Sequence, residues 1–73
     1  MNELTIARQL DKFLSLARGK GYEIRHEDLD GVGSGICVIR GRKCLFLDVT
    51  CGPAEQLESI QQNFAEQTTS HSQ

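Results

Sequence analysis

The sequence predicts an α+β fold with the element order α-β-β-β-α, in which a three-stranded antiparallel sheet is joined to an N-terminal and a C-terminal helix. Apolar residues recur at helical spacing over residues 3–18. Residues 22–28 alternate as in a half-buried strand, and two apolar runs, 36–40 and 43–50, flank a Gly-Arg pair. The chain has 73 residues, enough for one domain, which we expect over 1–66 with a disordered tail over 67–73.

The first helix is predicted from an apolar stripe and from its two ends. Asn2 is a suitable N-terminal cap, and Gly19 and Gly21 are typical of a helix stop. The stripe consists of Leu4, Ala7, Leu10, Leu14 and Ala17. Because the opposite face mixes both signs of charge, this helix is expected to pack on a core rather than on a membrane surface.

The two apolar runs predict a β-hairpin. Gly41-Arg42, with glycine first, suits a type II′ turn, which would place Ile39 opposite Cys44. One face would then carry Cys37, Ile39, Cys44 and Phe46, and the other would carry Ile36, Val38, Leu45, Leu47 and Val49. Both faces are apolar, so we expect the helices to cover one of them and to leave the other exposed.

The last helix is predicted to begin near Pro53, a favoured first helical residue. Short connections at both ends of the sheet favour both helices on one face. We expect them to cover the Cys37 face, with Tyr22 and Ile24 extending it and Phe46 in the core. Ile36, Val38, Leu45, Leu47 and Val49 would then form the interface of a two-fold homodimer. The alternative is one helix on each face and a monomer.

Composition argues against some classes of function. The net charge is −2, whereas a general binder of nucleic acid or of a membrane surface is usually basic. No apolar run approaches the length of a membrane span, and the N-terminus lacks the apolar region of a signal peptide. Three cysteines without a signal peptide predict free thiols and a cytoplasmic location.

The cysteines do not form a recognisable metal or redox motif. In the expected register Cys37 and Cys44 are diagonal neighbours, and Cys51 points to the opposite face. A C-x-x-C motif is absent, so we expect no metal, no cofactor and no disulfide. A three-ligand site of His26, Cys37 and Cys44 is the less favoured alternative. Cys51, at a strand end, is expected to be the most exposed and reactive thiol.

Candidate residues for other activities are few. Asp48 follows an apolar strand and precedes a helix, a position where catalytic acids occur, although a single Asp there more often accepts hydrogen bonds from nearby backbone N–H groups. Three cations, Arg40, Arg42 and Lys43, gather at the expected hairpin tip. They suit either a solvated turn that discourages aggregation or contact with nucleic acid.

The stretch GSGICVIRGRKCLFLD, with the helix after it, resembles small bacterial domains of uncharacterised function. The likeness covers about residues 22–64 and implies no activity. The element order is also similar to the front half of minimal zinc metallopeptidase domains. In that family the helix after the strand carries H-E-x-x-H, whereas PAEQLESIQQNFAEQ contains no histidine, so no catalytic residue carries over.

These observations together predict a non-enzymatic interaction module that associates with itself or with a protein partner. The second hypothesis is a nucleic-acid or regulatory-site binder that uses Arg40, Arg42 and Lys43. The third is an enzyme that uses Asp48 or Cys51.

Overall fold

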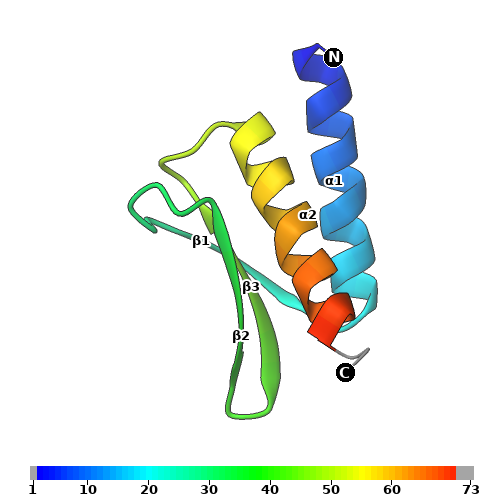
Figure 1. The fold of residues 1–73 in the computed structure, drawn as a ribbon, viewed down its shortest axis with the longest axis vertical. Helices are drawn as coiled ribbons and strands as arrows, with labels where there is room; N and C mark the ends of the chain where they lie inside the picture. Colours follow the sequence, from blue (N-terminus) through cyan, green and yellow to red (C-terminus); the bar gives the residue numbers. More distant parts are fainter. Residues whose placement is uncertain (1, 71–73) are drawn as a thin grey trace.

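The computed structural model describes residues 2–70, with side chains described to residue 65. Two helices that run in the same direction pack side by side on one face of a three-stranded sheet, giving two layers (Figure 1). The elements in chain order are α1 (Glu3–Gly19), β1 (Glu23–Glu27), β2 (Ser34–Ile39), β3 (Arg42–Asp48) and α2 (Pro53–Ser70). The predicted element order is therefore confirmed. Of the predicted tail 67–73, residues 67–70 belong to helix α2, contrary to the prediction, and residues 71–73 lie outside the described residues.

Helix α1 begins and ends where its sequence predicts. The Asn2 side chain accepts a hydrogen bond from the backbone N–H of Thr5, with 2.9 Å between N and Oδ1. This bond satisfies one of the donors that the first helical turn leaves without a partner. Leu14 and Ala17 are the buried residues of its inner stripe, and Gly21, with φ of 91°, turns the chain into β1.

The sheet is mixed, not fully antiparallel as the sequence predicted. Its strand order is β1-β3-β2, with β3 antiparallel to β2 and parallel to β1. The chain reverses once in loop 28–33 and again at the hairpin tip. Two reversals return the chain to its original direction, so β3 runs parallel to β1. β3 lies between β1 and β2 as the central strand.

The hairpin turn lies one residue earlier than predicted. Arg40 and Gly41 occupy its centre with φ of 53° and 80°, and Ile39 and Arg42 close the hairpin. Two positive φ values define a type I′ turn, whose twist matches that of the strands. The membership of each face is unchanged, but the register places Cys37 directly opposite Cys44.

The helices cover the face that the sequence analysis left exposed. Leu45 and Leu47 are 0% and 1% exposed, and Ile36 is half-buried beside them. Ile24 is opposite Leu45, so the apolar residues of β1 also lie on this face. The prediction that Tyr22 and Ile24 extend the Cys37 face is therefore wrong, and so is an open interface built on Leu45 and Leu47.

The core joins this sheet face to the inner stripes of both helices. Phe64 of α2 contacts the rings of Phe13 and Tyr22, with centroids 5.8 and 5.4 Å apart. The buried cluster consists of Leu14, Ala17, Leu45, Leu47 and Ile60. Phe46, expected in the core, is only half-buried on the opposite face of the sheet.

Candidate functional site

Asp48 is the central polar residue at the carboxyl end of β3. Its side chain is fully buried, and its carboxylate accepts hydrogen bonds from the backbone N–H groups of loop 28–33. The donors are Leu29 at 3.1 Å, Gly31 at 2.8 Å and Gly33 at 3.1 Å. A loop that would otherwise bury unpaired backbone donors is thus held to the end of the central strand.

The residues that follow Asp48 donate to the same carboxylate. Thr50 donates through its backbone N–H at 2.9 Å and through its hydroxyl at 2.6 Å, and the Cys51 thiol donates at 3.5 Å. Burial alone would raise the pKa of Asp48. The hydrogen bonds from Thr50, Gly33 and Leu29 outweigh burial and hold that pKa well below its ordinary value.

This geometry assigns Asp48 a structural task. A buried carboxylate that already accepts from the loop and from Thr50 offers no free oxygen to a substrate, so the position gives no support to a general acid or base. Its role matches the alternative in which a strand-end Asp binds backbone N–H groups.

Cys51 is not the exposed thiol that the sequence predicted. It is half-buried, whereas Cys37 is exposed and Cys44 is buried. Burial raises the pKa of Cys51, and the hydrogen bond and negative charge of Asp48 raise it further, with a contribution from Glu55. A raised pKa reduces the thiolate fraction at neutral pH, which is opposite to what a nucleophilic cysteine requires.

Cys37 and Cys44 lie together on the face of the sheet away from the helices. They are opposite residues in the β2–β3 ladder, so their side chains point to the same face. His26 is opposite Leu47 and therefore points to the other face. The three-ligand alternative is wrong on this ground, and among the side chains described, those of residues 2–65, no group of three or more His, Cys, Asp or Glu is placed to hold a metal ion.

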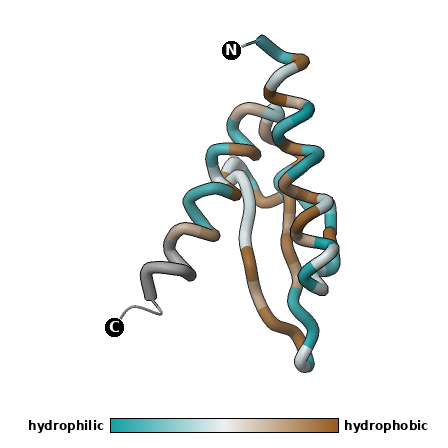
Figure 2. Tube along the Cα trace, turned by 90° about the vertical axis from the view of Figure 1, so that its right-hand side faces the viewer, coloured by the Kyte–Doolittle hydropathy of each residue, from teal (hydrophilic) through white to brown (hydrophobic). Residues whose placement is uncertain are grey.

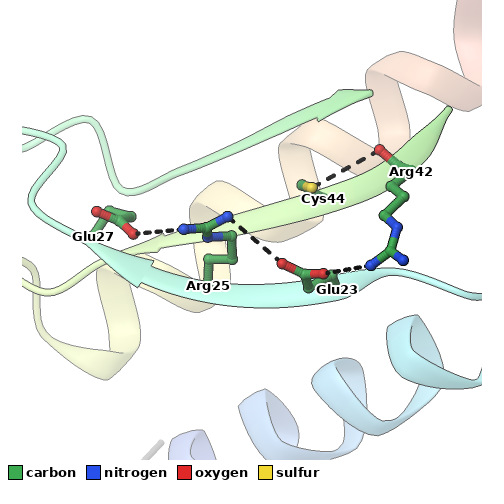
Figure 3. Close-up of polar contacts among 5 residues, drawn as sticks. All are labelled: Glu23, Arg25, Glu27, Arg42 and Cys44. Carbon is green, nitrogen blue, oxygen red and sulfur yellow. Dashed lines mark hydrogen bonds and ion pairs between the residues drawn. The ribbon is translucent and has the colours of Figure 1, made fainter. Parts of the chain in front are cut away.

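Charged side chains of β1 cover part of this outer face. Arg25 lies between Glu23 and Glu27, with nitrogen–oxygen distances of 3.7 and 3.8 Å, and Arg42 lies 3.7 Å from Glu23 (Figure 3). The Arg25 guanidinium also lies over the Phe46 ring, 5.9 Å from its centroid. The alternation of charges in EIRHE was the sequence signal that this face of β1 points to solvent.

The two edges of the sheet differ in chemistry. β1 carries Glu23, Arg25 and Glu27, whereas β2, with the sequence SGICVI, carries neither a charge nor a proline. Apolar residues run along β2 towards the tip (Figure 2). Val38 and Ile39 are 65% and 45% exposed, although they are large aliphatic residues.

Basic residues gather where the hairpin tip approaches the end of α1. A hollow of about 510 Å³ is lined by four cationic side chains, those of Arg18, Lys20, Arg42 and Lys43. Lys43 Nζ lies 5.5 Å from the centre of the Tyr22 ring. The sequence predicts the basic tip but not the addition of Arg18 and Lys20, because only the fold brings these distant residues beside it.

Comparison of the chain with family models, with curated proteins and with solved structures found no match. The resemblances noted from the sequence therefore stay predictions, and the fold supports a small α+β domain without a family assignment. Within residues 2–70, neither helix is both long and apolar enough to cross a membrane.

Proposed function

We propose that this protein is a small interaction module that forms a two-fold homodimer by pairing the β2 strands of two copies. The observation that carries the proposal is the chemistry of β2. It is an outer strand of the sheet and lacks the charges and proline that normally protect such edges. An edge of this kind is a template for another strand, and β1, with its three charged residues, is not.

Charge favours a second copy as the occupant of this edge. Antiparallel pairing under a two-fold axis sets the tip of one β2 beside the start of the other. The tip is basic through Arg40 and Arg42, and loop 28–33, which precedes β2, exposes the acidic residues Asp28 and Asp30. The two basic tips would lie at opposite ends of the pair, each near an acidic loop, so the arrangement is self-complementary.

The small size of the domain supports the same arrangement. A chain of 73 residues buries a limited fraction of its apolar surface, so shielding Val38 and Ile39 in a dimer supplies stability that the monomer lacks. The pairing would join two sheets of three strands into one continuous sheet. It requires no enzymatic activity, and we expect the module to act in the cytoplasm, through itself or a partner protein.

The test is the mass of the folded protein in solution. Light scattering coupled to size exclusion at micromolar concentration should give about twice the monomer mass of 8.1 kDa. Val38→Glu places a charge on the β2 edge and should give a folded monomer. Val49→Glu is the matched control, because Val49 is 57% exposed but follows β3, and it should stay dimeric. A monomeric wild type, or a folded and dimeric Val38→Glu, would overturn the proposal.

A second candidate function is binding of a polyanion such as nucleic acid, and the basic hollow favours it. Arg18, Lys20, Arg42 and Lys43 face a single acidic residue, Glu23, among the lining side chains. The overall charge of −2 and the Arg42–Glu23 ion pair argue for the dimer instead. Oligonucleotide affinity that falls steeply with salt, and that Lys20→Glu abolishes, would favour this second function.

A further inference from the structure

We infer that Cys37 and Cys44 form a reversible intrachain disulfide, so that the outer face of the sheet carries a thiol–disulfide redox site. The inference stands on the observed register and is independent of the proposed dimer. Cys37 and Cys44 are partners in the β2–β3 ladder, directly opposite each other. Opposite residues of an antiparallel pair have Cα atoms about 4.5–5.5 Å apart, within the range of about 4.4–6.8 Å that a disulfide requires.

The two thiols differ in access, and that difference suits a redox pair. Cys37 is exposed on the edge strand, so an oxidant can reach its sulfur. Cys44 is 3% exposed, with its Sγ 3.8 Å from the carbonyl oxygen of Arg42. The exposed Cys37 thiol is thus placed to be oxidised first to a sulfenic acid. The buried Cys44 thiol is placed to react with that sulfenic acid and form the disulfide.

The reaction needs an oxidant of the peroxide class and has two steps. Hydrogen peroxide transfers one oxygen to the Cys37 sulfur, its O–O bond breaks, and one water leaves. The Cys44 sulfur then attacks the sulfenic sulfur of Cys37. The S–S bond forms, the S–O bond breaks, and the Cys44 proton leaves with the hydroxyl as a second water. Two thiols lose two electrons and two protons, and a dithiol reductant reverses the change by exchange at the exposed Cys37 sulfur.

Cys51 is excluded from this pair by its position. It lies beyond the end of β3, its thiol donates to Asp48, and burial raises its pKa. The three cysteines thus divide into one cross-strand pair and one thiol that belongs to the Asp48 network. This division makes Cys51→Ser the background in which to test the pair.

The experiment treats folded Cys51→Ser protein with hydrogen peroxide, blocks residual thiols under denaturing conditions and measures the intact mass. We expect a chain lighter by two hydrogen atoms with no blocked thiol. Trypsin cuts after Arg40, Arg42 and Lys43, so the peptide that ends at Arg40 should stay joined to the one that begins at Cys44 until a reductant is added. Cys37→Ser and Cys44→Ser in the same background are matched controls, and neither should form this bond.

A folded-state control separates the effect of the register from mere closeness along the chain. With glutathione as a competitor, the ratio of intrachain disulfide to mixed disulfide should be at least about tenfold higher in the folded protein than in urea. A ratio that is equal or lower in the folded protein would overturn the inference. So would peroxide treatment that yields only sulfinic acid, only disulfide-linked dimers, or a Cys37–Cys51 bond in the wild type.

Discussion

At the scale of single residues, Asp48 shows how one buried carboxylate can organise the end of a sheet. Its oxygens accept from a loop that precedes it by 15 to 19 residues and from Thr50, which follows it. Gln56 of α2 donates to its backbone carbonyl oxygen at 2.7 Å. One residue therefore ties the loop after β1, the end of β3 and the start of α2 together.

The stability of the fold should depend on the charge of Asp48 at low pH. Its pKa lies below the ordinary value of 3.8 in the folded chain, so the folded state binds its proton less tightly than the unfolded state does. The resulting stabilisation is fully present above about pH 5 and is lost as the pH falls below the ordinary value towards the folded pKa. Urea unfolding at a series of pH values should show the free energy of unfolding declining across that acidic window.

Asp48→Asn removes the titrating group and identifies the source of that decline. The variant should be less stable than the wild type at neutral pH, because an amide has one acceptor oxygen where the carboxylate has two. Its stability should also fall less steeply below about pH 4 than that of the wild type. The same steep decline in both proteins would show that other carboxyl groups control acid unfolding.

At the scale of elements, loop 28–33 and α2 meet at a contact that only glycine permits. Gly33 has φ of 98°, and a Cβ placed there would lie 2.7 Å from the Cβ of Ser59 and 2.8 Å from its Oγ. The neighbouring Ser34 is buried and shares a 2.7 Å hydrogen bond with the same Ser59 hydroxyl, while Asn63 donates to Ser34 at 2.7 Å. This polar contact joins the start of β2 to α2.

Two glycine variants test this contact. Gly33→Ala should lower the free energy of unfolding by about 1–3 kcal/mol, because the backbone is left-handed and the new methyl group collides with Ser59. Gly35→Ala is the matched control: a Cβ there meets nothing within 4 Å, and stability should be unchanged or rise by up to about 1 kcal/mol. Equal losses in chemical denaturation would mean that the loop does not pack as described.

Local signals in the sequence predict the helices and strands. The features that the sequence did not predict depend on pairing between segments that are distant in the chain. The Asn2 cap, the helical stripe through Leu14 and the start at Pro53 were all readable, because each depends on a few neighbouring residues. The type I′ turn was missed because Arg40 adopts a positive φ, which is uncommon for a residue of its kind. Because the turn was predicted one residue too late, the predicted register did not place Cys37 opposite Cys44.

At the scale of the whole molecule, the position of β1 determines which face of the sheet is buried. Alternation within β1 predicts its two faces but not which of them matches Leu45. The parallel register with β3 aligns Ile24 with Leu45 and Arg25 with Phe46. Choosing the buried face required that register, which no short stretch of the sequence encodes. The basic hollow was missed for a similar reason, since Lys20 and Lys43 line the same hollow only in the folded chain.

Substitutions on the two faces of β3 test this assignment directly. Leu45 is 0% exposed beneath the helices, so Leu45→Ala should cost about 2–5 kcal/mol of unfolding free energy, enough to unfold a marginal domain. Phe46 is half-buried beneath Arg25 on the outer face, so Phe46→Ala should cost only about 1 kcal/mol, despite its larger side chain. Both variants can be compared by urea denaturation at constant pH. A larger loss for Phe46→Ala would place the helices on the face that carries Cys37 and would reverse the two layers of the fold.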